Sequence, residues 1–244
     1  MLNDAFHVHT FRCRHAENIP DEEYIKRAVA LGFSQITFTD HCPFPENPFG
    51  NRMDMEQLPE YIRTLTTLKE KYKNQIKVSI GLEAEYLPSY NEYYKKLLND
   101  NDIELLILGQ HFYEVNQNGK LSYSFENLTD EKRKTLWIKM AESTIEGINS
   151  GFFGVVAHPD RIFRMYDCLD DEMKNSSKQI ISAAAEHNIL LEKNISSMHT
   201  KRYYKPEFWT LASNIINDEN IIFGFDAHSL SELKPIDIAI QARA

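Results

Sequence analysis

Short apolar runs alternate with longer amphipathic stretches along most of the chain. Most of these runs are nearly continuous rather than strictly alternating, which is typical of parallel strands whose two faces are both covered by helices. We therefore predict seven strands. They span residues 4–10, 34–40, 76–83, 103–109, 152–158, 188–194 and 221–226.

The amphipathic stretches between these runs are predicted to be helices. Gly32 and Gly151 follow two of them as stop signals, whereas Asp54 and Pro206 are typical of helix starts. Repeated strand and helix pairs of this length predict either a doubly wound open sheet or a closed barrel. The predicted helices span residues 21–31, 54–73, 89–99, 129–150, 174–187 and 206–217.

Polar residues at the strand ends distinguish these two folds. A doubly wound sheet gathers such residues mainly at its switch point, whereas a barrel collects them at one rim from every strand. Each predicted strand is closed by His, Asp, Glu or Asn, so we predict an α/β fold that is a seven-stranded barrel. These residues are His7 and His9, Asp40 and His41, Glu83, His111, His158, Glu192 and Asn194, and Asp226 and His228.

Length and composition are consistent with one soluble domain. A chain of 244 residues is within the range of single α/β barrels, and 42% hydrophobic residues supply a core. The net charge of −9 argues against a general affinity for nucleic acid. The N-terminus lacks the pattern of a signal peptide, and no apolar stretch approaches the roughly 20 residues of a membrane span. We expect a cytoplasmic protein without membrane contact, and the oligomeric state is left open.

The chain has three cysteines, and no two of them form a CxxC pair. They are Cys13, Cys42 and Cys168. The sequence therefore indicates neither a disulfide framework nor a tetrathiolate zinc site. Cys13 and Cys42 stand beside candidate metal ligands. We interpret both as small buried packing residues, with direct coordination or a nucleophilic role as the alternative.

Seven of the nine histidines are candidate metal ligands, because imidazole is a common ligand and most of them stand beside an acid. His7 and His9 should point to the same face of a strand, since side-chain direction repeats every two residues. Glu83 and Glu85 are alternative bridging carboxylates, with Glu83 favoured. Asp40 is expected to orient a neighbouring ligand from outside the site.

The two other histidines, His187 and His199, receive no metal role. His187 is expected at a helix C-terminus, where an imidazole suits the exposed carbonyls. His199 lies in a polar stretch and is a candidate substrate contact.

The order of these motifs resembles that of the PHP-domain phosphoesterases (polymerase and histidinol phosphatase), particularly the histidinol-phosphatase branch. The resemblance runs from His7 to about Ser229 and includes HVH, His15, TDH, GLE, His111, AHPD and GFDAH. The segments TDHCPFPE and LLEKN are also similar to that branch, whereas GQHF departs from its SVHF-like segment.

The resemblance implies that residues 1–244 form one PHP domain, a distorted (β/α)7 TIM-like barrel with a trinuclear metal centre. We expect two or three divalent ions, with zinc, iron or manganese as the candidates. The implied ligands are His7, His9, His15, His41, Glu83, His111, His158, Asp226 and His228.

The expected reaction is hydrolysis of a small-molecule phosphate monoester, histidinol phosphate in particular, by a metal-bridging hydroxide. Glu83 would bridge two ions, and His7 and His9 would share an ion with Glu83 and Asp226. The leaving alkoxide would take its proton from Asp226, Asp40 or a metal-bound water, and the sequence leaves this choice open.

Phosphate also needs cationic donors, and guanidinium groups match its oxygens in bidentate fashion. Arg161, directly after AHPD, is the first candidate. The other candidates, which lie near strand ends, are Arg164, Arg202, Lys201 and Arg14.

Two alternatives to a histidinol phosphatase are kept. A PHP phosphatase or phosphoesterase would act on phosphotyrosine protein, a nucleotide or an oligonucleotide, although the acidic balance disfavours nucleic acid. A non-catalytic metal-binding module is disfavoured because every ligand position is filled.

Overall fold

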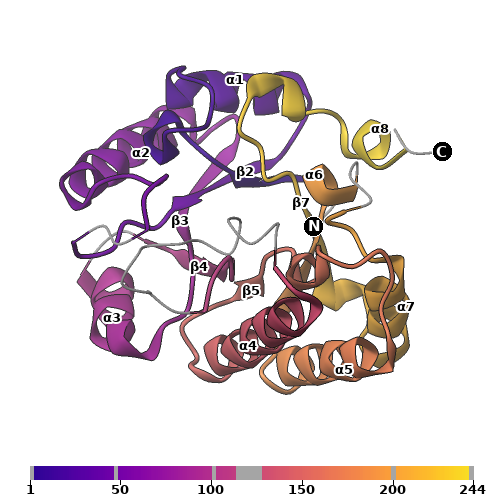
Figure 1. The fold of residues 1–244 in the computed structure, drawn as a ribbon. Helices are drawn as coiled ribbons and strands as arrows, with labels where there is room; N and C mark the ends of the chain where they lie inside the picture. The colour runs from indigo at the N-terminus through magenta and orange to yellow at the C-terminus, as the bar shows by residue number, and fades with distance from the viewer. Residues whose placement is uncertain (1–2, 47–48, 101–102, 114–127, 199–201, 242–244) are drawn as a thin grey trace.

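A computed structural model describes residues 3–46, 49–100, 103–113, 128–198 and 202–241, and in it seven parallel strands form a ring surrounded by helices (Figure 1). Each strand pairs in parallel with the next along the chain. All seven predicted strands are present with shifted ends. They are β1 (Asp4–Val8), β2 (Gln35–His41), β3 (Lys77–Ala84), β4 (Leu105–Leu108), β5 (Val155–Val156), β6 (Leu190–Asn194) and β7 (Ile221–Gly224).

The first strand and the segment after the last strand close the ring. The backbone N–H of Phe225 donates to the carbonyl of Phe6 over 2.8 Å, and that of Ala227 donates to His7 over 3.0 Å. The N–H of His9 donates back to Ala227 over 2.9 Å. These bonds confirm the prediction of a seven-stranded barrel.

Six helices match the six predicted amphipathic stretches, and most of them surround the strands in Figure 1. They are α1 (Asp21–Ala30), α2 (Leu58–Tyr72), α3 (Asn91–Asp100), α4 (Asp130–Asn149), α5 (Asp171–Glu186) and α7 (Pro206–Ile215). Two helices that were not predicted, α6 (Ile195–Met198) and α8 (Ile236–Gln241), are too short for a clear period. None of the helices in the described part of the chain is long and apolar enough to cross a membrane.

Helix ends follow the sequence signals in most cases. Gly32 has a φ of +80°, which suits glycine at a helix stop, and Asp54 forms a capping box ahead of α2. His187 caps the C-terminal end of α5, as predicted. The start of α5 was predicted too late, because Asp170 accepts a hydrogen bond from the Met173 N–H and begins the helix earlier.

Short 3₁₀ helices lie between these elements and were not predicted. They are η1 (Phe11–Cys13), η2 (Met55–Gln57), η3 (Pro88–Tyr90), η5 (Pro159–Phe163), η6 (Asp218–Asn220) and η7 (Leu230–Glu232).

Apolar side chains fill two separate regions. The larger cluster lies between the strands and the helices, for example where Leu65 of α2 and Ile80 of β3 are both buried. A smaller cluster consists of Phe6, Ile107, Val155, Ala157 and Ile222, from four different strands and the residue after β5. Because two of its members directly precede His7 and His158, this cluster lies next to the polar strand ends.

Candidate metal centre

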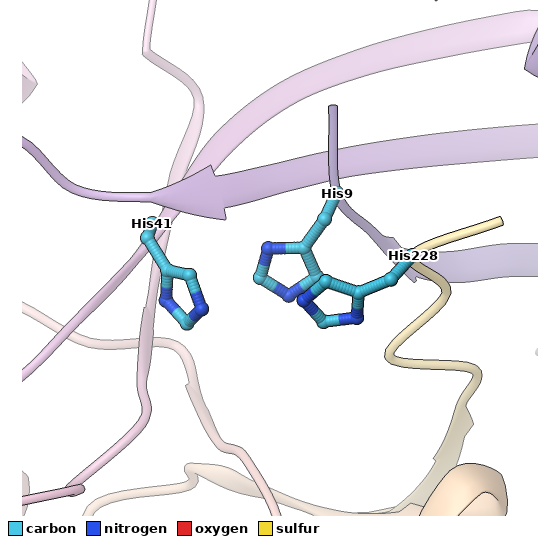
Figure 2. Close-up of side chains that lie close together, drawn as sticks. All are labelled: His9, His41 and His228. Atoms are coloured by element: carbon cyan, nitrogen blue, oxygen red, sulfur yellow. The ribbon is translucent and has the colours of Figure 1, made fainter. Parts of the chain in front are cut away.

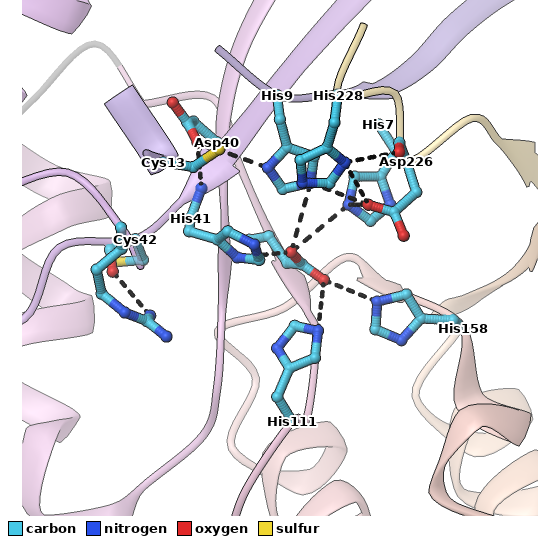
Figure 3. A network of polar contacts seen from close by, with 12 residues as sticks. His7, His9, Cys13, Asp40, His41, Cys42, His111, His158, Asp226 and His228 are labelled. Carbon is cyan, nitrogen blue, oxygen red and sulfur yellow. Dashed lines mark hydrogen bonds and ion pairs between the residues drawn. The ribbon is translucent and has the colours of Figure 1, made fainter. Parts of the chain in front are cut away.

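The carboxyl ends of the strands bring the predicted ligands together around Glu83 of β3. His41 Nδ1 lies 2.9 Å from Glu83 Oε2, and His158 Nε2 lies 2.9 Å from Oε1. The Nε2 atoms of His7 and His9 are each 3.6 Å from Oε2, and His111 Nε2 is 3.6 Å from Oε1. In Figure 3 these five imidazoles surround a common centre.

A second carboxylate, Asp226, lies on one side of this group. Its Oδ1 is 3.2 Å from His9 Nε2 and 3.7 Å from His7 Nε2. His228 comes from the same segment, and its ring stacks on that of His9 with centroids 4.1 Å apart (Figure 2). The ring of His15 lies 4.5 Å from that of His228, so this more exposed histidine joins the same cluster.

Two of the inward-facing imidazoles are held from outside by acids. His7 Nδ1 lies 2.6 Å from Glu192 Oε2, and His111 Nδ1 lies 2.9 Å from Glu85 Oε1. An acid at one ring nitrogen fixes a proton there, so that a cation would bind through the other nitrogen once that nitrogen is deprotonated. Nε2 of each ring is therefore available toward Glu83.

Backbone carbonyls orient two further rings. His15 Nδ1 lies 2.8 Å from the carbonyl oxygen of Cys13, and His228 Nδ1 lies 2.9 Å from that of Asp226. Since a carbonyl oxygen only accepts hydrogen bonds, Nδ1 of both rings carries the hydrogen, and Nε2 has the lone pair that can bind a metal ion. Metal-ligating histidines commonly have this arrangement.

Several buried ring nitrogens in the cluster have no hydrogen bond. Among the described residues, Nε2 of His7, both ring nitrogens of His9 and Nε2 of His228 have no hydrogen-bond partner. A buried polar atom without a partner costs about 1–3 kcal/mol, so native chains rarely leave several together. Divalent cations would satisfy the Nε2 atoms of His7, His9 and His228, and the residues therefore fit a metal centre.

Within the described part of the chain, five groups of three side chains have ligand atoms within 4.8 Å of one another, and they overlap through His9, Cys13, His41 and His228. This overlap suits more than one ion. The groups are His9, His41 and His228; Cys13, His15 and His228; His7, His9 and Asp226; His9, Cys13 and Asp40; and His41, Glu83 and His111.

Both central carboxylates are held in their charged form. Burial by itself would raise the pKa of Glu83, but the imidazoles of His111, His41 and His7 outweigh it and hold the pKa well below its usual value. For Asp226, burial is likewise outweighed by His7, His9 and His228, which lower its pKa. The site offers anionic oxygen ligands at neutral pH.

The imidazoles differ in charge. Burial lowers the pKa of His41 to about 3, so this ring is neutral. Burial also opposes the charging of His7, yet Glu192, Glu83 and Asp226 raise its pKa to about 10. A cation that binds His7 must therefore displace a proton, which makes metal binding depend on pH.

The backbone at three of the site residues lies in the left-handed region. The φ angles are 65° at His7, 35° at His158 and 51° at Asp226. Such angles are uncommon outside glycine and cluster at functional sites. The pairing of β1 with β2 is irregular between Phe6 and Val8. His7 and His9 do lie together, with ring centroids 5.0 Å apart, but the predicted reason, regular strand alternation, was wrong.

The structure distinguishes the two candidate bridging acids by their partners. Glu85 receives two hydrogen bonds from Arg52, over 3.0 and 3.2 Å, in addition to its contact with His111. Glu83 instead lies among the rings. Asp40 is behind His9, with Oδ1 3.5 Å from His9 Nδ1, and it accepts a hydrogen bond from Thr10.

Sequence reasoning missed Glu192 and Arg52 as parts of the site. Glu192 was noted at a strand end, and its position in the pattern was the available signal. Arg52 lies in a polar loop between β2 and α2 and has no signal in a single sequence. Its guanidinium contacts Glu85, and it also donates to the carbonyl of Cys42 over 3.0 Å.

A cavity of about 310 Å³ opens onto the cluster and includes Arg161 in its lining. Arg161 Nη1 is 3.5 Å from Asp226 Oδ2. Its guanidinium carbon lies 4.9 Å from the centre of the Tyr203 ring. The other described residues that line the cavity are His15, His41, Gly50, Asn51, Arg52, Glu85, His111 and Phe112.

The other candidate phosphate contacts are placed less directly. Arg202 is exposed, 5.8 Å from the Tyr203 ring, and Arg14 is exposed beside Asp54. Arg164 is buried and is not among the described residues that line the 310 Å³ cavity. His199 and Lys201 lie outside the described residues.

A larger cavity, about 890 Å³, lies beside α7 and β7 and is lined by Lys193, Tyr204 and Trp209 among others. None of the nine candidate ligands is among its described lining residues. The chemistry of the smaller cavity, rather than the size of the larger one, identifies the candidate site.

Comparison with known proteins gives a family and several relatives. The family model for the PHP domain matches residues 5–196. A probable histidinol-phosphatase from Deinococcus radiodurans is 36% identical over 109 residues, which are 43% of this chain and 41% of that protein. The histidinol-phosphatase of Bacillus subtilis is 33% identical over 92 residues, which are 35% of this chain and 34% of that protein. The chain thus matches well under two thirds of the length of both relatives.

A solved structure of similar fold covers nearly the whole chain. It is the histidinol phosphate phosphatase of Lactococcus lactis, complexed with zinc, L-histidinol and phosphate. The TM-score is 0.73 at 17% identity, and the match covers 98% of this chain and 93% of that one. This likeness shows a shared barrel.

Proposed function

This chain belongs to the PHP domain family, and from that membership we propose that it hydrolyses a small phosphate monoester, L-histidinol phosphate, to L-histidinol and phosphate. The observation that carries the proposal is the convergence of imidazoles on Glu83 beside a small cavity lined by Arg161. The names of the two bacterial relatives and the ligands in the Lactococcus lactis structure support the choice of substrate.

The proposed centre holds two or three divalent ions, with zinc, iron or manganese as candidates. The relative that is complexed with zinc supports zinc. Such ions would polarise the phosphate and lower the pKa of water from about 15.7 toward about 7. The proposed ligands are His7, His9, His15, His41, Glu83, His111, His158, Asp226 and His228.

Glu83 is proposed as the shared ligand because both of its oxygens face imidazoles, whereas Glu85 is occupied by Arg52. Its low pKa keeps it ionised throughout the neutral range. Glu85 and Glu192 hold His111 and His7 in the tautomer that offers Nε2 inward. These two contacts would therefore orient both rings toward the proposed ions.

Arg161 is proposed to bind the phosphate group. It lines the cavity, and its contact with Asp226 places the guanidinium beside the cluster. A planar guanidinium donates two parallel hydrogen bonds to phosphate oxygens. Arg164, Arg202 and His199 stay secondary candidates for contacts with the rest of the substrate.

Asp226 is proposed over Asp40 as the residue that handles the proton of the leaving alkoxide. Asp226 touches Arg161 at the cavity, whereas Asp40 is enclosed by Thr10 and His9. The neighbouring imidazoles lower the pKa of Asp226, so its carboxylate is ionised before the reaction and could take up the proton that the attacking water releases and pass it to the alkoxide.

The test uses the full chain purified without chelator, with its metals measured by elemental analysis. The value of kcat/KM is compared for L-histidinol phosphate, a phosphotyrosine peptide and a short DNA with a 3′-phosphate. A clear preference for L-histidinol phosphate supports the proposal. A preference for another ester would make that ester the proposed substrate instead. A fully metal-loaded chain that hydrolyses none of them indicates a non-catalytic module.

Glu83→Gln provides the matched variant for this assay, because the amide keeps the size of the side chain and removes its charge. We expect loss of both bound metal and turnover. If the native chain binds metal but has no turnover, and Glu83→Gln only loses the metal, the result would support the non-catalytic module instead.

A further inference from the structure

Cys13 lies inside the histidine cluster, and the proposed function does not use it. Its side chain is fully buried at the end of η1, four residues after His9 and two before His15. Sγ lies within 4.8 Å of ligand atoms of both His15 and His228. It forms a second such group with His9 and Asp40.

The neighbouring imidazoles are already arranged as ligands. His15 and His228 each have Nδ1 against a backbone carbonyl, which leaves Nε2 as the atom that can bind a cation. Nε2 of His228 is buried without a hydrogen-bond partner. His9, with no exposed surface, has both ring nitrogens in the same condition. Two imidazoles with unpartnered buried ring nitrogens, those of His9 and His228, thus lie beside the Cys13 thiol, together with the more exposed ring of His15.

The turn that carries Cys13 is fixed by hydrogen bonds of its neighbour Arg12 and of its own backbone N–H. Arg12 donates through Nη1 to Thr10 over 3.1 Å and to Asp21 over 2.9 Å, and through Nε to Glu60 over 2.8 Å. The Cys13 N–H also donates to the carbonyl of Thr10 over 3.2 Å. Such anchoring holds a ligand in place without metal, which reduces the entropy lost on binding.

The other two cysteines lack this environment. Cys42 is buried beside His41, but its Sγ lies 3.3 Å from the carbonyl oxygen of Pro43. Cys168 is exposed. Neither belongs to a candidate metal group within the described residues, so the two provide matched controls.

We propose that Cys13 is a direct thiolate ligand of the metal position formed with His15 and His228. This inference rests on the proposed metal centre. On binding, the S–H bond breaks, the proton passes to solvent and a sulfur–metal bond forms without any change of oxidation state. A thiolate favours softer ions such as zinc over manganese, so Cys13 would set the metal preference of this position.

The test replaces bound metal with Co(II) and records the near-ultraviolet spectrum, where a thiolate ligand gives a sulfur-to-cobalt charge-transfer band. We expect this band in the native chain and in the Cys42→Ala, Cys168→Ser double variant, whose single remaining thiol is Cys13. Cys13→Ser should lose the band. The preference of this variant for zinc over manganese should fall by at least about tenfold. That is the lower end of the usual loss in metal affinity when groups around a metal are changed.

A native chain that binds cobalt and hydrolyses the ester, yet shows no thiolate band, overturns the role of Cys13 and leaves the proposed function intact. A native chain that binds no cobalt, zinc or manganese overturns both proposals. Zinc X-ray absorption of the native chain supplies a second measurement if Cys13→Ser fails to fold. Sulfur at about 2.3 Å from zinc supports the inference, and its absence refutes it.

Discussion

His7 Nδ1 and Glu192 Oε2 are 2.6 Å apart, and neither side chain has exposed surface. The contact joins the first strand to the sixth across the interior of the barrel. Gly224 on β7 makes room for it, because a Cβ there would collide with the Glu192 carboxylate. Glu192 therefore holds a central imidazole in the tautomer and orientation that direct Nε2 to Glu83 and Asp226.

We expect Glu192→Gln to weaken metal binding by about 10- to 100-fold, as is usual when the partner of a metal-ligating histidine is altered. The amide keeps the size but cannot keep the negative charge that raises the pKa of His7. Dialysis against graded chelator, followed by elemental analysis, measures the effect. Glu186→Gln, at an exposed position of α5, is the control. Equal metal retention in both variants would contradict the assigned role of Glu192.

The second prediction concerns Gly109, which lies against Glu83. A Cβ at this position would collide with the Glu83 carboxylate oxygen and come within 2.6 Å of its Cγ. Glu83 is buried among imidazoles and has no room to retreat. We expect Gly109→Ala to displace the carboxylate, with at least about a 100-fold fall in kcat/KM, the scale of losing one charge-stabilising group.

Gly154→Ala is the control for this substitution. Its Cβ would meet the end of the Leu105 side chain at 2.8 Å, which a rotation can relieve. Metal content and kcat/KM should stay near native there. Full metal occupancy in Gly109→Ala would show that Glu83 is not held as described.

The sequence predicted the strands because parallel strands covered on both sides are continuous apolar runs, and this pattern is local. A local pattern does not report contacts between distant parts of the chain, and this explains the errors in the strand bounds and in the pairing of β1. The predicted strand 152–158 is only Val155–Val156, and the pairing of β1 is interrupted near His7. Backbone angles such as the φ of 65° at His7 depend on the assembled barrel, and no spacing rule in one sequence reports them.

The candidate ligands were predictable because histidines and acids at successive strand ends must meet at one rim of a barrel. The groups that orient them were harder to find. Arg52 reaches Glu85 from a loop 33 residues away in sequence, and nothing in its local context indicates that contact. A single chain reveals which residue types are present, but long-range partners need the fold.

The third prediction concerns phosphate binding. We expect Arg161→Met to lower kcat/KM for the phosphate ester by about 10- to 100-fold, the range for a hydrogen bond to a charged group. Metal content should not change, because the proposed ligands are intact. Arg161→Lys should recover part of the activity through charge alone. Arg63→Met on the exposed face of α2 is the control, and a loss of bound metal in Arg161→Met would contradict a purely substrate-binding role.

A fourth prediction concerns stability at the opposite end of the barrel. Asp4 begins β1, where its Oδ2 accepts hydrogen bonds from Gln35 over 2.9 Å and Thr37 over 3.1 Å. Burial raises the pKa of Asp4 to about 6, although the Thr37 hydroxyl and Lys77 oppose the shift. The folded chain thus keeps this proton to a higher pH than the unfolded chain, whose pKa is near 3.8.

Because the folded state binds more protons between these two values, the contribution of Asp4 to the free energy of unfolding falls as pH rises from about 4 through about 6. Above that range the folded chain carries a poorly hydrated carboxylate. Asp4→Asn keeps an oxygen acceptor for Gln35 and Thr37 and cannot ionise. We expect it to be more stable than the native chain by on the order of 1–2 kcal/mol near pH 7, after allowance for partial exposure.

Urea unfolding of the metal-free chains at a series of pH values measures this difference, since the histidines titrate alike in both. The gap between Asp4→Asn and the native chain should open between about pH 4 and pH 6 and then stay constant. A gap that is the same at every pH would mean that the substitution acts through packing, and that the Asp4 carboxyl has an ordinary pKa in the folded barrel.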